Sequence, residues 1–124
     1  MAERIGREHG VEMIYRLSGE PFTISQPATH ELMMVAREAV FNSILHGHAQ
    51  QIEAELTYVN ESLSLSIKDD GMGFDTAEVF SEGHFGLRGM KERISRFNGK
   101  FEIESALGQG ARVRVEIPRA AVAQ

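Results

Sequence analysis

Glu38, Asn42 and His46 follow one another at intervals of four residues within a segment of good helix formers. This spacing places the three side chains on one face of an α-helix. A carboxylate and an amide oxygen are hard ligands, which suit Mg²⁺ and its water shell. A solvated polar stripe is the commoner explanation of such a pattern. Because the rest of the segment is strongly apolar, however, a functional interpretation of this face stands on equal terms with a solvated one.

A second group of residues begins with Asp69, where an apolar alternating run ends, and continues through Gly71 and Gly73. Glycines adopt positive φ angles readily and let a ligand approach the backbone closely. A carboxylate at the edge of the core can accept a hydrogen bond from an amino group such as N6 of adenine. Taken alone, the same pattern is also typical of a tight turn with incidental acidic residues.

A third group, which includes Gly86 and Gly89, precedes a helix that we expect to run from about Met90 to Phe97 and to stop at Asn98-Gly99. Glycines at a helix N-terminus present free amides and the positive end of the helix dipole to phosphates. An ordinary loop before a helix has the same appearance. The order of the three groups, with strands between them, is far more specific than any one group.

Hydrophobic periodicity indicates the elements that position these groups. Alternation of apolar and polar residues predicts strands at 11–17, 52–58, 63–67, 101–103 and 113–117. A largely buried helix is expected from about His30 to Leu45, with Thr29 as its N-cap. Each strand has one apolar and one charged face. The fold class is therefore a two-layer α/β sandwich, in which a mostly antiparallel sheet of about five strands is covered on one face by two or three helices.

The length, cysteine count and net charge of the chain exclude several classes of function. The 124 residues predict one domain spanning 1–124, with a core at about 9–118 and a frayed tail at 119–124. The absence of cysteine excludes disulfides and thiolate metal sites, and a net charge of -5 argues against a nucleic-acid partner. Without a long apolar run or a signal peptide, we expect a cytoplasmic domain that makes no direct membrane contact.

The ordered motifs resemble those of the GHKL ATPases, a family with the Bergerat fold that groups gyrase, heat-shock chaperones, histidine kinases and the MutL repair proteins. The resemblance covers roughly Glu31 to Pro118. Within the family the chain looks like the sensor kinases related to nitrate and degradative-enzyme sensors. Two features favour that group over gyrase and the chaperones. They are a short loop from Thr76 to Phe85 and the sequence motif His-Phe-Gly-Leu-x-Gly-Met-x-Glu-Arg.

The resemblance implies a role for each motif. Asn42 would coordinate Mg²⁺, and Glu38 would be a second metal ligand and the catalytic residue near the γ-phosphate of ATP. Asp69 would bind adenine N6, with Gly71 and Gly73 lining the base. The remaining candidates for nucleotide binding lie near the phosphates or in the last glycine motif, and they are His46, Gly86, Leu87, Arg88, Gly89, Met90, Gly108 and Gly110.

Two positions depart from the family pattern. Leu45 stands where members usually carry Lys or Arg, and Ala111 stands where a threonine usually supports the adenine aspartate through water. The missing cation shifts its share of phosphate binding to His46, Arg88 or Lys91. Losing one hydrogen bond costs on the order of 1 kcal/mol. We therefore expect nucleotide binding weaker than is typical, with the fold unaffected.

The function implied by the resemblance is that of the ATP-binding catalytic domain of a two-component sensor histidine kinase. Such a domain delivers the γ-phosphate of Mg-ATP to a histidine on a separate dimerisation domain, which passes it to a response regulator. None of the five histidines has the sequence context of a phosphoacceptor, so the domain alone should turn over little. An anti-sigma-factor-type serine kinase and a degenerate ATP-sensing scaffold stay open as alternatives, as does an upstream inner-membrane anchor.

Overall fold

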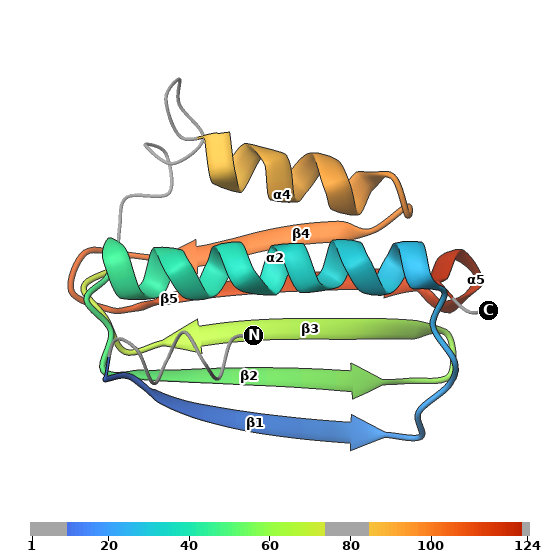
Figure 1. Cartoon of the computed structure of the whole chain (residues 1–124), viewed down its shortest axis with the longest axis horizontal. Helices are drawn as coiled ribbons and strands as arrows, with labels where there is room; N and C mark the ends of the chain where they lie inside the picture. The colour runs from blue at the N-terminus through green and yellow to red at the C-terminus, as the bar shows by residue number, and fades with distance from the viewer. Residues whose placement is uncertain (1–9, 74–84, 123–124) are drawn as a thin grey trace.

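The computed structural model describes residues 10–73 and 85–122, and in these ranges it contains a sheet with helices packed on one face (Figure 1). The loop predicted from Thr76 to Phe85 lies outside the described residues except for Phe85 itself. The elements in chain order are β1 (Glu12–Gly19), α2 (Gln26–Leu45), β2 (Gln51–Tyr58), β3 (Ser62–Asp69), α4 (Phe85–Ser95), β4 (Lys100–Ser105), β5 (Ala111–Pro118) and α5 (Arg119–Val122). The predicted two-layer α/β sandwich is confirmed.

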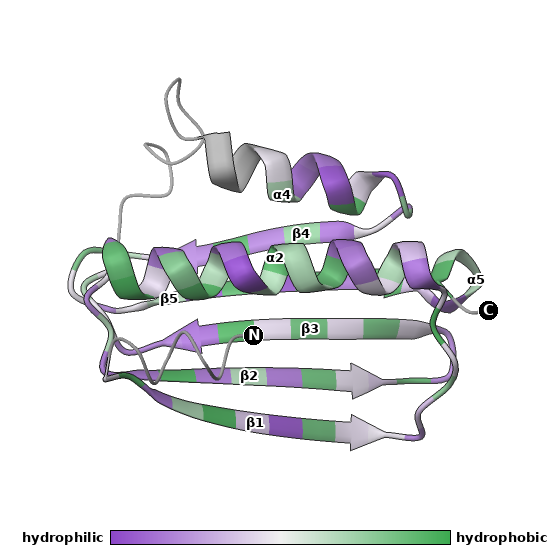
Figure 2. Ribbon diagram, viewed as in Figure 1, coloured by the Kyte–Doolittle hydropathy of each residue, from purple (hydrophilic) through white to green (hydrophobic). Residues whose placement is uncertain are grey.

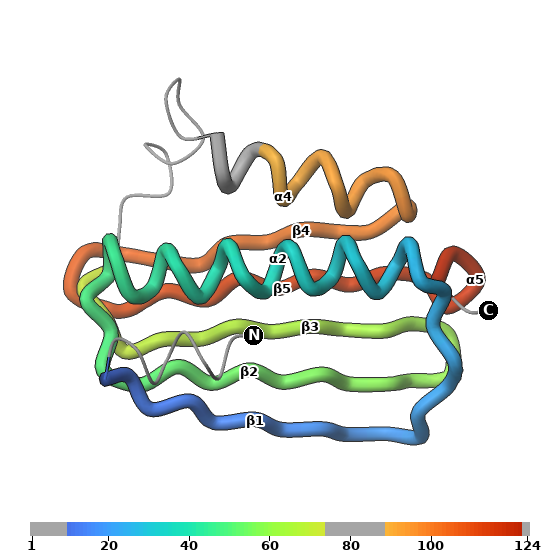
Figure 3. Tube along the Cα trace, viewed as in Figure 1, coloured from blue at the N-terminus to red at the C-terminus, as the bar shows by residue number. Residues whose placement is uncertain are grey.

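The five strands lie in the order β1-β2-β3-β5-β4. β1 pairs with β2 in parallel, and the other three pairings are antiparallel, as expected for a mostly antiparallel sheet. β2 and β3 form an antiparallel hairpin, with Leu56 opposite Leu65. In the pairing of β3 with β5, Asp69 lies opposite Ala111. The end of α2, the end of β3 and the connection from β4 to β5 therefore lie at the same end of the molecule (Figure 3), which brings two glycine-containing motifs together.

Alternating side chains build the core. Hydrophobic and hydrophilic residues alternate along β2 and β3 (Figure 2), as a sheet covered on one face requires. Ile52, Leu63 and Ile117 are among the largest fully buried side chains, and α2 contributes Val35 and Val40 to the same set. At about 25 cal/mol per Å² of apolar surface, burial of these side chains anchors α2 on the sheet. This packing fixes the position of α2, and with it the polar residues of α2, relative to β3 and β5.

The start of α2 differs from the prediction. The N-cap is Ser25, whose Oγ accepts a hydrogen bond from the Ala28 N–H at 3.3 Å, and not Thr29. Thr29 lies inside the helix, where its hydroxyl donates to the carbonyl of Ser25 at 3.0 Å. Pro27 belongs to the first turn, where a missing N–H costs nothing, and does not break the chain. Over the described residues, no helix is both long and apolar enough to cross a bilayer.

The start of α4 also lies earlier than predicted. The helix begins at Phe85 and not near Met90, so Gly86 and Gly89 are helical residues. Packing of Met90 and Ile94 into the core, where they are 2% and 0% exposed, outweighs the low helix propensity of glycine. The helix ends at Ser95, slightly before the predicted Phe97, and a turn leads to the predicted stop at Asn98-Gly99. Asn98 has a φ of 57°, in the left-handed region.

The predicted fraying of the tail is wrong for the part of it that the structure describes. Arg119–Val122 forms the short helix α5, and Val122 is fully buried. The Arg119 N–H donates to the Glu61 carbonyl at 2.8 Å, and the Ser25 N–H donates to the Val122 carbonyl at 2.8 Å. The α5 segment therefore covers the end of the core where α2 begins.

An ion pair joins the two large helices, and its removal has a predictable effect. Arg93 Nη1 lies 2.8 Å from Glu31 Oε2, and the side chains are 37% and 16% exposed. We expect Glu31→Ala to lower the free energy of unfolding by about 1 kcal/mol, at the upper end for such pairs because Glu31 is mostly buried. Glu53→Ala, which breaks the more exposed pair of Glu53 with Arg16, is the matched control and should cost about half as much or less. Urea unfolding of the two variants checks the prediction, and equal losses would contradict it.

Candidate functional site

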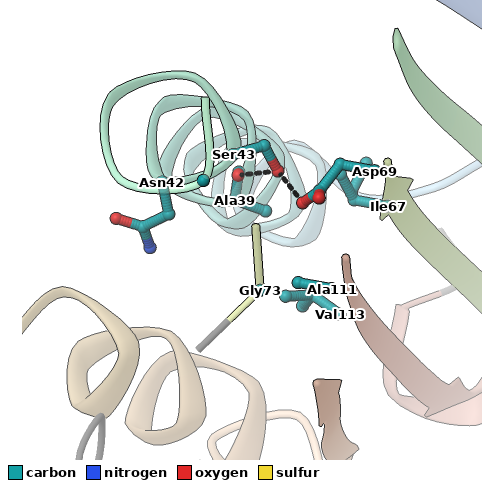
Figure 4. Close-up of a pocket in the computed structure, with 9 residues that line it drawn as sticks. Ala39, Asn42, Ser43, Ile67, Asp69, Gly73, Ala111 and Val113 are labelled. Carbon is teal, nitrogen blue, oxygen red and sulfur yellow. Dashed lines mark hydrogen bonds between the residues drawn. The ribbon is translucent and has the colours of Figure 1, made fainter. Parts of the chain in front are cut away.

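A narrow slot opens between the C-terminal half of α2 and the adjacent ends of β3 and β5 (Figure 4). Its volume is about 10 Å³, which is the space of about one water molecule. The lining is apolar except for a few polar groups at one end, and consists of Ala39, Asn42, Ser43, Gly47, Ile67, Asp69, Gly73, Ala111 and Val113. An apolar slot with few, convergent polar groups is typical of small-molecule sites.

Asp69 is the buried carboxylate of this slot. The residue is 7% exposed, and it ends β3. Its Oδ1 accepts a hydrogen bond from the Gly71 N–H at 2.8 Å, and its Oδ2 accepts one from the Ser43 hydroxyl at 2.6 Å. Two donors from different segments thus fix the plane of the carboxylate. An ionised carboxylate accepts about four hydrogen bonds, so acceptor capacity is left for a further donor from a ligand.

Ser43 is a site residue that sequence reasoning missed. It lies on α2 next to Asn42 and is 7% exposed. Ser43 also lies opposite the slot from Ala111, the position that lacks the usual threonine hydroxyl. The Ser43 hydroxyl donates to the Asp69 carboxylate, the group that the threonine usually supports in the GHKL ATPases. A serine within an apolar helix has no distinctive spacing, and only the β3 neighbour reveals its role.

Removing the Ser43 hydroxyl should weaken both the fold and the site. Ser43→Ala leaves Asp69 Oδ2 without its 2.6 Å donor in a buried place, which costs roughly 1–3 kcal/mol of stability. For the nucleotide that the motifs predict in this slot, we expect affinity to fall about tenfold, because the carboxylate loses one of its two fixed donors. Urea unfolding and calorimetric titration measure the two effects. Ser95→Ala, on the exposed side of α4, is the control; a Ser43→Ala variant indistinguishable from it would contradict this role.

Glycines surround the slot because the backbone segments approach too closely for side chains. Gly73 and Gly110 have φ angles of 68° and 75°. A Cβ atom at Gly73 would overlap the carbonyl oxygens of Ala106 and Gly110, and one at Gly110 would overlap the carbonyl oxygen of Asp69. Both candidate positions therefore require glycine for the shape of the slot.

Three further glycines complete the loops around the slot. Gly71 approaches the carbonyl of Gly47, a slot residue that the sequence did not reveal. Gly108 has a φ of 80°, and its N–H donates to the carbonyl of Met72. A side chain at Gly108 would meet open space, so only its backbone conformation favours glycine. The last glycine motif is thereby tied to the loop that follows Asp69.

The predicted polar face of α2 is present, but its three residues differ in surroundings. Glu38 and Asn42 are half-buried, and His46 is exposed at the C-cap. Asn42 lines the slot, and its amide points away from Asp69 (Figure 4). Among the described residues, no three His, Asp or Glu side chains gather into a metal site. A metal held by Asn42 and Glu38 would therefore complete its shell with water and ligand oxygens, as Mg²⁺ commonly does.

The residues of the third motif, from Gly86 to Met90, differ in their positions within α4. Since α4 begins at Phe85, the first four amides without helical partners are those of residues 85–88, which include Gly86, Leu87 and Arg88. The side chains of these four residues lie outside what the structure describes. Gly89 comes later in the helix. Met90 is 2% exposed within the hydrophobic core, so its side chain packs against the protein and is not presented to a nucleotide in this structure.

Asp70, beside the slot carboxylate, binds backbone and not the slot. Its Oδ1 accepts from the Gln50 and Gln51 N–H groups at 2.9 and 3.0 Å. The Gln51 N–H lowers the pKa of Asp70 below its ordinary value of 3.8; burial opposes this shift, and the Gln50 N–H adds to it. A carboxyl with a depressed pKa stabilises the fold above its unfolded pKa, and this stability is lost as pH falls through the folded pKa.

A comparison of pH profiles tests this contribution. As the pH falls below 3.8, the free energy of unfolding should decrease more steeply for the wild-type protein than for Asp70→Asn, which cannot titrate. Other carboxylates titrate equally in the two proteins. Chemical unfolding between pH 2 and 7, on the order of ten points, measures the difference. Parallel profiles would contradict the assigned hydrogen bonds.

The fold and the slot together define an ATP-binding type of α/β sandwich, and sequence comparisons agree. The family model of histidine kinase-, DNA gyrase B-, and HSP90-like ATPases matches residues 28–121. The chain belongs to this family, as the motifs predicted. Within it, the chain is an ATP-binding catalytic domain of the sensor histidine kinase type.

Individual relatives support this placement. The histidine-protein kinase/phosphatase DegS of Bacillus subtilis is 35% identical over 70% of this chain and 23% of its own length. The sensor histidine kinase LnrJ of the same species is 33% identical over 94% of this chain and 28% of its own length. A histidine kinase domain from Erythrobacter litoralis shares the fold, with a TM-score of 0.79, 17% identity and coverage of 96% and 58%. The chain thus spans about a quarter of the curated relatives.

Proposed function

We propose that this domain binds Mg-ATP in the slot and serves a two-component sensor histidine kinase as its phosphoryl-donating part. The γ-phosphoryl group passes to a histidine on a separate dimerisation domain and then to a response regulator. The observation that carries the proposal is the buried Asp69 carboxylate, which Ser43 and Gly71 hold with acceptor capacity left over. A carboxylate in an apolar slot suits the exocyclic amino group of adenine, which is a planar base with a donor at its edge.

The base is recognised between α2 and the sheet. Adenine N6 donates to Asp69, and the flat faces of the base lie against apolar lining such as Ala39 and Val113. Gly73 and Gly110 keep the backbone close enough for the base to reach the carboxylate. A volume of about 10 Å³ is smaller than an adenine, so we expect the slot to widen when nucleotide enters.

The phosphates extend from the base towards Asn42 and the N-terminus of α4. Asn42 and Glu38 are the ligands proposed for Mg²⁺, which supplies neutralisation of phosphate charge when bound. The free amides of residues 85–88 give further donors to phosphate oxygens. Leu45 is 53% exposed and brings no cation, so exposed His46 is left as the basic group at the end of α2. Phosphoryl transfer depends mainly on positioning and charge neutralisation, which these groups provide.

The alternatives weigh less on these findings. The curated relatives DegS and LnrJ are histidine kinases, which favours a histidine over a serine acceptor in a partner protein. A degenerate scaffold that has lost nucleotide binding was suggested by Leu45 and Ala111. The Ser43 hydroxyl speaks against that loss, because it reaches the carboxylate from the other side of the slot.

Calorimetric titration of the 124-residue chain with a non-hydrolysable ATP analogue, with and without Mg²⁺, tests the proposal. We expect binding that strengthens when Mg²⁺ is present. Titration with the corresponding guanine nucleotide is the control, and it should bind at least about tenfold more weakly because its base presents a carbonyl to Asp69. Absence of binding, or equal binding of both nucleotides, would overturn the proposal. Rapid autophosphorylation by this chain alone would contradict the need for a separate acceptor domain.

A further inference from the structure

Four hydrogen bonds join the loop that ends α2 to the loop that follows β3. We call residues 46–51, which include the first residue of β2, the helix-end loop, and residues 70–73 the glycine loop. Asp70 Oδ1 accepts from the Gln50 and Gln51 N–H groups at 2.9 and 3.0 Å, and its own N–H donates to the Gln51 carbonyl at 3.3 Å. The Met72 N–H donates to the Gly47 carbonyl at 2.7 Å. Both loops are therefore held as one unit.

Each of the two joined loops contributes a residue to the lining of the slot. Gly47 and Gly73 line the slot from opposite loops, and Asp69 immediately precedes Asp70. The helix-end loop also continues from the turn of α2 that carries Ser43, and the Ala49 N–H donates to the Ser43 carbonyl at 3.0 Å. A shift between the loops would therefore change the distance between the Ser43 hydroxyl and the Asp69 carboxylate.

The geometry favours a strong acceptor at residue 70 because two consecutive backbone amides, those of Gln50 and Gln51, donate to one oxygen there. His48 adopts a φ of 51°, which is unfavourable for a residue other than glycine and requires support from its surroundings. A single carboxylate oxygen that accepts two backbone amides gives charge-assisted hydrogen bonds, which are stronger than neutral ones. Asp70 is itself exposed and does not line the slot, so it acts on a ligand only through these loops.

We propose that Asp70 is a positioning residue that sets the slot geometry by clamping the helix-end loop to the glycine loop. The expected effect on nucleotide affinity rests on the proposed function. The clamp itself rests only on hydrogen bonds within the domain. Loss of the clamp lets Gly47 and Ser43 move relative to Asp69. Nucleotide affinity then falls although no group that touches the nucleotide has changed.

The experiment compares Asp70→Ala and Asp70→Asn with wild-type protein, and Glu102→Ala as a matched control that removes an exposed strand carboxylate on β4. Two quantities are measured: affinity for a non-hydrolysable ATP analogue, and amide hydrogen exchange without ligand. We expect Asp70→Ala to bind about tenfold more weakly and Asp70→Asn, which keeps the acceptor oxygen, within about threefold of wild type. In Asp70→Ala the amides of Met72 and Gly71 should exchange faster, together with those of Gln50 and Gln51.

The outcomes separate the clamp from the proposed function. Faster exchange confined to Gln50 and Gln51, with Met72 and Gly71 protected and affinity unchanged, would overturn the clamp and leave Asp70 a local cap. If wild-type protein binds no nucleotide, the proposed function fails, and exchange at Met72 and Gly71 still decides whether the clamp exists. If Asp70→Ala does not fold, exchange in Asp70→Asn decides the same point, because its neutral acceptor weakens the clamp without removing it. Faster exchange at Met72 and Gly71 than in wild type supports the clamp, and unchanged exchange at both overturns it.

Discussion

Asp69→Asn is expected to reduce nucleotide affinity by about 100-fold or more, the largest loss of any single substitution in this domain. The wild-type carboxylate accepts from the Ser43 hydroxyl and the Gly71 N–H, and in the proposed function it also accepts from the amino group of the base. An asparagine side chain has one acceptor oxygen, and its amide nitrogen donates. One of the two acceptor oxygens is therefore lost, and so is the charge that strengthens the hydrogen bonds to the remaining one. The Ser43 hydroxyl can turn to the Ala39 carbonyl, 3.0 Å away, and accept from the new amide nitrogen, so the loss is expected to be larger for the base than for the fold.

The fold should survive this substitution, since asparagine and aspartate have nearly the same volume. Calorimetric titration measures the affinity, and circular dichroism with a thermal melt shows whether the variant is folded. Glu102→Gln, the same chemical change on the exposed side of β4, is the control and should bind as wild type does. A folded Asp69→Asn protein that retains affinity within about threefold of wild type would show that Asp69 does not recognise the base.

Deletion of residues 119–124 is expected to lower the free energy of unfolding by about 3–5 kcal/mol, a large part of the stability of a domain of this size. The deletion removes fully buried Val122, whose burial is worth about 1.5–3 kcal/mol. It also removes the 2.8 Å hydrogen bonds that join Arg119 to Glu61 and Val122 to Ser25, at roughly 1 kcal/mol each. The Arg119 guanidinium, 4.4 Å from the centroid of the Phe22 ring, is lost as well.

Urea unfolding, followed by circular dichroism, measures the change. Deletion of residues 123–124 alone is the matched control, because it shortens the chain and leaves α5 in place. We expect that control to unfold within about 0.5 kcal/mol of the full chain. A loss below about 1 kcal/mol on removal of all six residues would mean that α5 does not support the core.

Much of the fold was predictable because each strand shows its two faces in the sequence. Leu63, Leu65 and Ile67 alternate with small or charged residues, and the structure places them on the helix side of the sheet. The ends of the helices were less predictable. Ser25 and Thr29 are both good N-caps, and nothing local distinguishes them; the hydrogen bond from Ser25 to Val122, far along the chain, accompanies the earlier start.

In the candidate site too, residues in local sequence motifs were predictable, and residues whose roles depend on tertiary contacts were not. Asp69 and its glycines are typical of a tight turn when taken alone, and they could be proposed because they occur in order with two other motifs of a known family. Ser43 and Gly47 could not be found in this way, because their roles depend on which strand end lies beside α2. The surroundings of Met90 could not be predicted for a related reason: a methionine beside glycines looks the same whether it faces a ligand or the core, and here its side chain is 2% exposed in the core.

The central claim is that the slot beside Asp69 receives the purine of ATP, and a crystal structure with the Mg²⁺ complex of a non-hydrolysable ATP analogue tests it most directly. We predict that the adenine amino nitrogen lies about 3 Å from an Asp69 carboxylate oxygen, between α2 and the ends of β3 and β5. A structure in which the base binds elsewhere, while Asp69 contacts only Ser43 and Gly71, would contradict the account.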